Sequence, residues 1–439
     1  MSKRNKTAAV GAAILALCMA LSLASCASSG QSSAASASAS SSASAASAPT
    51  DASASSSTAS SAASASSASS HSDSAAYSDA SDGGHAILAD GESASYNNIS
   101  VTKTGEASGD NADFYGENAA IFATNGATLD LTNATIDTDG THANGVFSYG
   151  TGTTVNISDS IIDTHGNCSG ALMTTGDGTM NATNITAHTT GRSSATIRSD
   201  RGGGTVTVEG GTFTTDGSGS PTIYSTADIT VSDATLTSTQ SQGVVIEGKN
   251  SVTLNDVTLT ADNNKKNSNK SPYYQAVMIY QSMSGDAKVG EAFFTMNGGT
   301  LTNKNGDIFF VNNTSTTIAL NGATIVNEDA NGVFLRAAAA GWGKEGKNGG
   351  KVVLNATNQV INGDMVVDDI SSLDLHLAGT STLTGAINTD NSAASIAVEL
   401  ADGATWKLTG DSYITSFSGD ASAIDLNGFS LYVGGELFS

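Results

Sequence analysis

The sequence predicts an all-β fold, a parallel β-helix in which each coil of the solenoid contains three strands. Two observations carry this prediction. A six-residue motif recurs at the interval of a repeat protein, and short runs of Val, Ile, Leu and Thr alternate with Asn, Asp and Gly. The motif is clearest in Leu254–Leu259, where two apolar positions flank an Asn-Asp turn and a Thr. Such a pattern favours strands joined by tight turns rather than helices.

Successive motifs start roughly 23 to 28 residues apart, with one longer interval of about 42 after Leu254. The other copies are Leu131–Ile136, Ile157–Ile162, Met180–Ile185, Val208–Phe213, Val231–Leu236, Met296–Leu301 and Leu320–Ile325. Stacked coils place like residues in interior columns. We expect one column from Leu131, Ile157, Met180, Val208, Val231 and Leu254, and a second from Ile136, Ile162, Ile185, Phe213, Leu236 and Leu259.

A third apolar run completes each coil, for example in 145–148, 170–173, 222–224 and 244–247. From about Ala94 to the C-terminus, the chain resembles bacterial surface proteins with a right-handed parallel β-helix, an architecture shared by pectin-lyase-like enzymes and many adhesin-like proteins. The right-handedness is what this resemblance implies, because the repeat alone does not define it. Residues 83–439 are expected to form this domain, including an N-terminal cap and closing C-terminal coils.

Residues 1–25 are expected to be a signal peptide. Lys3, Arg4 and Lys6 precede an apolar run that ends at Leu23-Ala24-Ser25-Cys26, which resembles the lipobox of bacterial lipoproteins. The resemblance implies that Cys26 becomes the lipidated first residue, so that the protein is secreted and held at the outer face of the membrane. Residues 26–82 are almost entirely Ser and Ala, cannot form a core, and are expected to be a disordered tether.

The chain is acidic, with 18 Lys and Arg against 41 Asp and Glu. Three of the bases precede Cys26, so the mature chain has 18 − 3 = 15 bases and a formal charge of 15 − 41 = −26. A surface of this charge argues against nucleic acid as a partner and suits an extracellular monomer whose only contact with the membrane is its lipid.

The regular coils are expected to be interrupted by two insertions, residues 262–274 and 337–350, the second of which carries Trp342. If alternate residues of the third strand point outward, they form a column that includes Ser148, Met173 and Val311. Arginine, tyrosine and carboxylate side chains at this spacing predict a carbohydrate-binding strip, although exposed strands also carry such residues without a ligand. The residues proposed for binding are Arg198, Tyr224, Glu247, Tyr280, Arg336 and Trp342.

No residue is assigned a catalytic role. Arg198, Asp200 and Glu247 could form a lyase-like group, but no double-Asp or Gly-His-Gly element accompanies Asn388-Thr389-Asp390. Two hypotheses therefore stay open. The first is an adhesin-like or carbohydrate-binding protein that meets an extracellular, cell-wall or host-surface glycan. The second is a polysaccharide lyase or glycoside hydrolase on a pectin-lyase-like scaffold.

Two further columns allow other functions. Asp139, His165, His188 and Asp216 follow the second strand of neighbouring coils and could hold a divalent ion, with calcium as the candidate, or could only cap turns. No cofactor is required. A Thr-apolar-Thr ladder, which consists of 212–214, 235–237, 258–260 and 300–302, resembles the arrays of β-helical ice-binding proteins, a third hypothesis.

Overall fold

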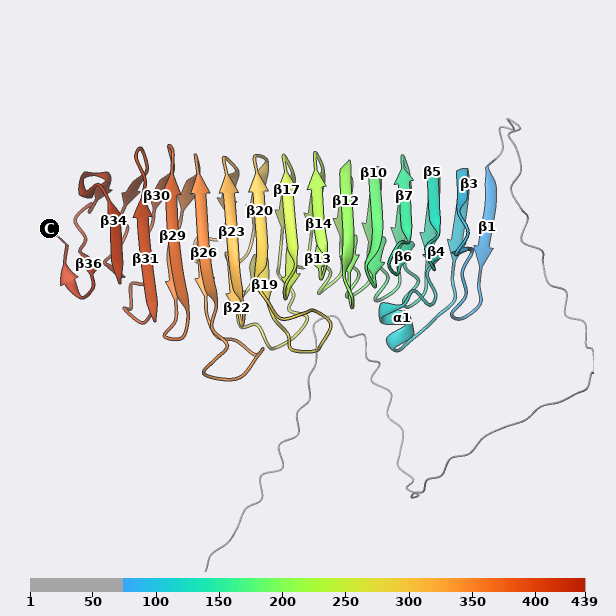
Figure 1. The fold of residues 1–439 in the computed structure, drawn as a ribbon, viewed down its shortest axis with the longest axis horizontal. Coiled ribbons are helices and arrows are strands. Elements are labelled where there is room, and N and C mark those ends of the chain that lie inside the picture. Colours follow the sequence, from blue (N-terminus) through green and yellow to red (C-terminus); the bar gives the residue numbers. More distant parts are fainter. Residues whose placement is uncertain (1–73, 439) are drawn as a thin grey trace, which may run out of the picture.

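A computed structural model describes residues 74–438, which form one stack of coils from the first strand to the last (Figure 1). Strands of successive coils lie side by side and pair in parallel, as in β13, β14 and β15 of one coil against β16, β17 and β18 of the next. The predicted parallel β-helix with three strands in each coil is confirmed.

The larger sheet has 19 strands and contributes two strands, or one long bent strand, to most coils. Its strands are β1 (Ala75–Asp79), β3 (Ala94–Lys103), β5 (Thr128–Thr138), β7 (Thr154–Ser158), β8 (Ile161–Thr164), β10 (Gly178–Thr189), β12 (Gly204–Thr215), β14 (Asp228–Ser232), β15 (Thr235–Ser238), β17 (Ser251–Asn255), β18 (Thr258–Ala261), β20 (Ala292–Asn297), β21 (Thr300–Asn303), β23 (Ser315–Asn321), β24 (Thr324–Asn327), β26 (Lys351–Thr357), β29 (Ser372–Ala378), β31 (Ser395–Leu400) and β34 (Ser416–Gly419).

The second sheet has 11 strands, one from each successive coil up to β28. They are β2 (Ile87–Asp90), β4 (Ile121–Thr124), β6 (Val146–Tyr149), β9 (Leu172–Thr175), β11 (Ile197–Ser199), β13 (Ile223–Ser225), β16 (Val244–Glu247), β19 (Gln275–Tyr280), β22 (Asp307–Asn312), β25 (Leu335–Ala337) and β28 (Met365–Val367). The short helix α1 (Asp110–Phe114) and the longest loops project at the lower edge of Figure 1, where these strands lie.

Two small sheets and a 3-10 turn close the C-terminal end. They comprise β27 (Val360–Asn362), β30 (Thr382–Thr384), β32 (Thr405–Lys407) and β35 (Ile424–Asp425), then β33 (Ser412–Ile414), β36 (Leu431–Val433) and β37 (Glu436–Leu437), with η1 (Ala421–Ala423) between them in the chain. The final pair, β36 and β37, is antiparallel. The closing coils therefore belong to the same stack, as expected.

One continuous apolar core fills the interior of the coils. The predicted columns are present in the regular coils, where Val208, Val231 and Leu254 are opposite one another, as are Phe213, Leu236 and Leu259. The coil of β10 departs from the prediction by two residues. Ala182 and Ala187 occupy the column positions there, whereas Met180 lies opposite Val155 and Ile185 lies opposite Gly211.

The boundary of the domain also differs from the prediction. β1 starts at Ala75 and pairs with β3, so residues 75–79 belong to the β-helix and not to the tether predicted for 26–82. The signal segment 1–25, Cys26 and most of the predicted tether lie outside the described residues. The two insertions are confirmed, because 262–274 separates β18 from β19 and 338–350 separates β25 from β26; of the second predicted insertion, Ala337 alone belongs to a strand.

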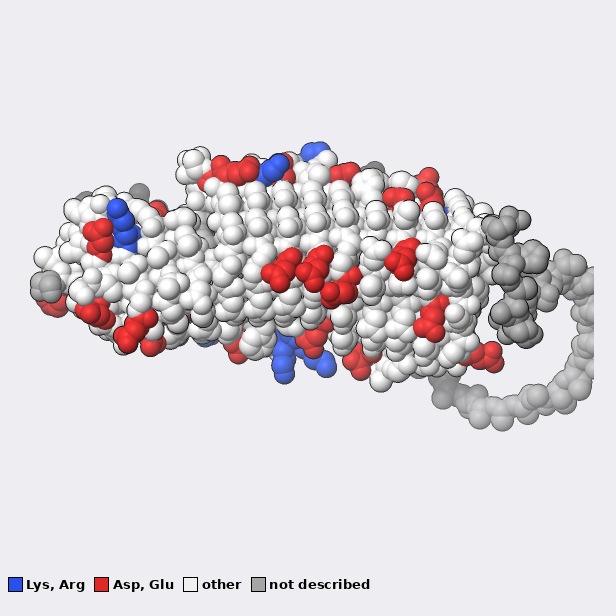
Figure 2. All heavy atoms as spheres, turned by 90° about the horizontal axis from the view of Figure 1, so that it is seen from above, with Lys and Arg blue, Asp and Glu red and all other residues white. Residues whose placement is uncertain are grey.

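Charged side chains are sparse on the face drawn in Figure 2. Isolated acidic side chains and a few basic ones lie among rows of uncharged atoms, and these rows repeat with the coils. Within the described residues, no helix is both long and apolar enough to cross a membrane.

Candidate functional site

The outer face of the 11-stranded sheet is covered by loops, and we call it the loop-covered face. Residues 104–120 with α1, the insertions 262–274 and 337–350, and residues 281–291 between β19 and β20 all fold over it. Two apolar clusters lie beneath them, one with Phe122, Phe147 and Met173, the other with Met278, Tyr280, Phe310 and Trp342. This face therefore has a second, outer core.

This cover overturns the prediction of a solvent-facing strip. Glu247 and Tyr280 are 0% exposed, Trp342 is 1% exposed, and Arg198 and Tyr224 are 2% and 6% exposed, so these side chains do not form an open strip on the surface. Ser148 and Val311, which we expected to point outward, do not: Phe147 lies opposite Met173 and points outward into the first apolar cluster, and Val311 points inward. A shift of one residue along a strand moves a side chain to the other face of the sheet. The sequence does not show how the third strands of neighbouring coils pair, so the face of these residues could be assigned wrongly.

The predicted strip is also not one column. Tyr224 lies opposite Arg198 on one side and opposite Val245 on the other, and Glu247 lies two residues farther along, opposite Tyr280. A two-residue shift keeps the face of the sheet but moves the side chain along the strand. Arg198 and Tyr224 are thus adjacent, whereas Glu247 and Tyr280 form a second, deeper pair.

Arg336 occupies a separate place on this face. Its Nε donates to Asp307 Oδ2 at 2.6 Å, and its guanidinium lies over the Tyr273 ring at 4.2 Å from the centroid. An arginine that is paired and stacked in this way fastens the insertion 262–274 to the sheet.

An open depression on the loop-covered face lies over three successive coils, those of β11, β13 and β16. Arg198, Tyr224 and Gln242 supply polar groups, and Ala195, Pro221 and Val245 supply apolar surface. Its volume is about 390 Å³, including the part open to solvent. A concave site with mostly apolar walls and a few polar groups is typical of small-ligand sites, so we call it the Arg198 depression.

The insertion 262–274 forms one wall of this region. Asn267 Nδ2 donates to Ser193 Oγ at 3.5 Å, and the Asn267 side chain lies so close to Gly219 that a Cβ there would be 2.3 Å from Asn267 Cγ. A smaller depression within the insertion is lined by Lys265, Lys266 and Tyr273, and Gln242 lines both depressions. Positively charged side chains therefore border the Arg198 depression in an otherwise acidic protein.

A buried ion pair supports Arg198 from below. Its NH2 group donates to Asp200 Oδ2 at 2.9 Å, and the second oxygen of Asp200 accepts a hydrogen bond from the Arg201 backbone N–H at 3.0 Å. Asp200 is 0% exposed. Burial raises the pKa of its carboxyl to about 7 against the opposing effect of Arg198, and the charges of Asp286 and Glu247 add to the rise.

Glu247 lies at the centre of a hydrogen-bond network. Its Oε2 accepts from the hydroxyls of Tyr224 at 2.6 Å and Tyr280 at 2.9 Å, and its Oε1 accepts from the Ser282 hydroxyl and, at 3.3 Å, from the Ser282 backbone N–H. Burial and the Glu247 charge raise the pKa of both phenols well above the usual range, so they remain donors. The network fixes the Tyr224 ring, which lines the Arg198 depression.

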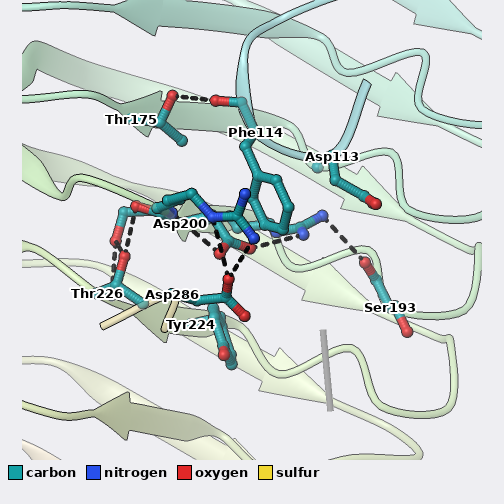
Figure 3. Close-up of polar contacts among 12 residues, drawn as sticks. Asp113, Phe114, Thr175, Ser193, Asp200, Tyr224, Thr226 and Asp286 are labelled. Carbon is teal, nitrogen blue, oxygen red and sulfur yellow. Dashed lines mark hydrogen bonds and ion pairs between the residues drawn. The ribbon is translucent and has the colours of Figure 1, made fainter. Parts of the chain in front are cut away.

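Arg201 connects three segments that are far apart in the chain. Its NH2 group lies 2.9 Å from Asp286 Oδ1 in residues 281–291, its NH1 group lies 3.2 Å from Asp110 Oδ2 of α1, and its guanidinium lies 3.8 Å from the Phe114 ring centroid. Figure 3 shows Phe114, Asp200 and Asp286 around these contacts, with Tyr224 and Ser193 nearby. We call Arg198, Arg201, Asp200, Glu247 and Asp286 the Arg–acid cluster.

Of the four residues predicted to hold a metal ion, the structure brings His188 and Asp216 together. His188 Nε2 lies 2.8 Å from Asp216 Oδ2, and this hydrogen bond lowers the pKa of Asp216. Because the coil of β10 is shifted by two residues, His188 lies opposite Asp163 rather than in the row of Asp139, while His165 Nε2 is 3.5 Å from Asp137. The predicted residues thus lie in two separate histidine–aspartate pairs, His188 with Asp216 and His165 with Asp137, and not in one row.

Within residues 74–438, the three potential metal ligands whose ligand atoms lie within 4.8 Å of one another are Asp113, His142 and Cys168. His142 Nε2 is 2.6 Å from Asp113 Oδ1, and its Nδ1 is 2.9 Å from the Ala107 carbonyl oxygen. Both ring nitrogens are therefore engaged, and the imidazole holds the segment with α1 against the body of the solenoid.

The Thr-apolar-Thr ladder is present as predicted. Thr212, Thr235, Thr258 and Thr300 are opposite one another on adjacent strands of the 19-stranded sheet, as are Thr214, Thr237, Thr260 and Thr302. The geometry confirms the ladder, while ice binding stays a hypothesis.

A comparison with known proteins found no matching family model, curated protein or solved structure. The function of the candidate site is therefore inferred from its geometry. Sequence reasoning identified Arg198 and Tyr224 but missed Pro221, Gln242 and Asp286. The signal that could have found the cluster is the concentration of Arg192, Arg198 and Arg201 in one coil of a base-poor chain.

Proposed function

We propose that this protein is displayed at the cell surface through a lipid on Cys26 and binds acidic carbohydrate in the Arg198 depression. One observation carries the binding proposal: a guanidinium and an aromatic ring line an open depression whose other walls are largely apolar. A guanidinium pairs well with the carboxylate or sulfate of a sugar, and rings and apolar walls suit the C–H faces of pyranoses.

The surroundings of the depression support an anionic ligand. Lys265 and Lys266 are exposed and line the neighbouring depression, and the exposed Arg192 directly precedes Ser193 of the wall. These cations increase the local concentration of an acidic glycan, although the protein as a whole repels it. Binding should therefore weaken as salt screens the attraction.

The enzyme hypothesis receives less support. A lyase or glycoside hydrolase needs a carboxylate or another base that reaches the substrate. Asp200 and Glu247 are the acids nearest to Arg198 and Tyr224, but both are 0% exposed and both carboxylates accept hydrogen bonds from the protein. Their geometry suits them to holding Arg198 and Tyr224 in place.

The test is a glycan array probed with the purified full chain, with and without calcium. We expect binding to uronate-containing or sialylated glycans, and no binding to their neutral counterparts. Arg198→Lys keeps the charge but loses the planar fork, and should weaken binding roughly tenfold. Val245→Phe should fill the depression and abolish glycan binding.

Lys351→Gln is the control, because it removes an exposed positive charge on β26 of the larger sheet, outside the Arg198 depression. It should bind as the wild type does. An array without acidic glycans among its hits, or equal binding by Val245→Phe and wild type, would show that the depression is not the site.

A further inference from the structure

The buried charges beneath Arg198 are unbalanced. The Arg–acid cluster has two guanidinium groups and three carboxylates, and Asp200, Glu247 and Asp286 are at most 5% exposed. If all of them were ionised, the cluster would carry one excess negative charge before any ligand arrived. An anionic ligand at Arg198 adds a second negative charge in a region that water does not screen.

Asp200 cannot move away from such a ligand. It shares the Arg198 guanidinium at 2.9 Å and is fixed from the other side by the Arg201 backbone N–H. Arg198 lines the depression with 3% of its side chain exposed, and an anion that reaches its guanidinium there would lie on the order of 4–6 Å from the Asp200 carboxylate, the range in which like charges strongly favour protonation. The two negative charges compete for one arginine.

We propose that an anionic sugar bound at Arg198 is taken up together with a proton, which Asp200 accepts. The inference rests on the proposed function, since it needs an acidic ligand in the depression. The proton neutralises Asp200, and the charge of Arg198 then balances the ligand alone. Binding and protonation are thereby linked, and each strengthens the other.

Asp200 is the group suited to accept this proton. Its pKa is already about 7 in the free protein, because burial outweighs the attraction of Arg198. The other groups that face it are engaged elsewhere: Glu247 of β16 accepts from two phenols and Ser282, and Asp286 is paired with Arg201, which also contacts Asp110 of α1. Lys270 of the insertion 262–274 interacts electrostatically with Glu247.

The consequence is tighter binding at lower pH. A ligand that raises the pKa of Asp200 by about 1.5 weakens roughly tenfold between about pH 6.5 and 8.5, and its binding takes up about 0.7 proton per site midway between the two pKa values. Below about pH 6 the affinity should level off, because Asp200 is then already protonated.

The experiment measures proton uptake directly. Trigalacturonate or 3′-sialyllactose is added to the full chain in unbuffered solution held at about pH 7.7 by a pH-stat, so that no buffer anion competes for Arg198. The ligand carboxylates titrate far below this pH and release no protons. We expect uptake of about 0.7 proton per bound acidic ligand, and none with maltotriose.

Two variants locate the proton. Asp200→Asn should still bind the acidic ligand but take up no proton and lose the pH dependence of its Kd. Asp139→Asn, which removes an exposed acid on the larger sheet, should behave as the wild type does. If Asp200→Asn fails to fold, the wild-type measurement still decides the proposal.

The outcomes separate the two claims. If neither acidic probe binds at pH 6.5 or at pH 8.5, the proposed function is wrong and this inference fails with it. If a probe binds with the same Kd at both pH values and without proton uptake, acidic-sugar binding stands and the proton linkage is overturned.

Discussion

At the residue scale, the turn centre of the repeated motif has a specific backbone role. The chain bends there between the two strands that each coil gives to the larger sheet, and the residue at the bend adopts a positive φ. These residues are Asn133 (53°), Asp159 (50°), Asn184 (53°), Gly210 (70°), Asp233 (52°) and Asp256 (50°). Asn, Asp and Gly tolerate this left-handed conformation best, which explains why they recur at this position.

The inward columns should not tolerate a charge. Leu236 is fully buried between Phe213 and Leu259. Leu236→Asp places a carboxylate there without a partner, at a cost on the order of 3–5 kcal/mol, and should unfold or aggregate the protein. Circular dichroism melting is the measurement.

Thr235→Asp is the matched control, because Thr235 is the preceding residue and points to solvent. It should melt close to wild type. A Leu236→Asp protein with the wild-type melting temperature would contradict the column assignment.

Asp200 predicts a pH dependence of stability. Its pKa is raised from 3.8 in the unfolded chain to about 7 in the folded protein, so between these values the folded state binds more protons. Stability from this group is therefore fully present below about pH 4 and is lost as the pH rises through about 7. The melting temperature of wild type should fall over this window relative to that of Asp200→Asn.

Above about pH 8 the difference between the melting temperatures of wild type and Asp200→Asn should be constant, because Asp200 is then ionised in both the folded and the unfolded wild-type protein. A melting-temperature difference that stays flat from pH 4 to 8 would show that Asp200 is ionised throughout.

At the element scale, α1 illustrates how tertiary contacts hold a segment that cannot persist alone. It has five residues, far fewer than an isolated helix needs in water. Asp113 pairs with His142, the Phe114 carbonyl accepts from Thr175 Oγ1 at 2.6 Å, and Arg201 contacts both Asp110 and the Phe114 ring. The same arginine holds Asp286, so one side chain contacts both α1 and residues 281–291.

Arg201→Gln should loosen both segments together. It leaves the buried Asp286 without its ion pair and removes the cation over Phe114. We expect faster amide hydrogen exchange in 110–114 and 281–291, with unchanged protection of β14 and β17.

Lys288→Gln serves as its control, since it removes an exposed positive charge from the same loop. Exchange that rises in only one of the two segments, or equally in both variants, would argue against a shared clamp.

At the scale of the whole molecule, the described residues form one continuous stack with a single interior core, and the loops that build the candidate site all lie on one side of it. A rigid solenoid of this kind presents a site at a fixed place along its length. The proposed lipid on Cys26 would tether that stack to the membrane through the Ser- and Ala-rich segment.

The anchor predicts a labelling result. A radioactive fatty acid supplied to cells should mark the wild-type protein and not Cys26→Ser, because the proposed lipobox would make Cys26 the lipidated residue. Cys168→Ser changes a cysteine buried in the solenoid and should keep the label. Label that persists in Cys26→Ser would place the lipid elsewhere or disprove the lipobox.

The sequence by itself determined the architecture. Each coil obeys local rules, namely alternating apolar residues for the interior and Asn, Asp or Gly at the bend, so the repeat, the columns and both insertions could be predicted. The errors are local too. In β10, Met180 and Ile185 resemble column residues, but the small Ala182 and Ala187 occupy the column and Asn184 takes the bend.

The tertiary structure alone decided which outward residues meet solvent. Alternation along a strand defines a face, but the exposure of that face depends on where the loops fold, and contacts such as Arg201 with Asp286 or Asn267 with Ser193 join residues far apart in the chain. For this reason Tyr280 and Trp342 lie buried in the outer apolar cluster beneath the loops. Arg198 and Tyr224, which are 2% and 6% exposed, line the depression that remains beside the insertion 262–274, where the Asn267 side chain packs against Gly219.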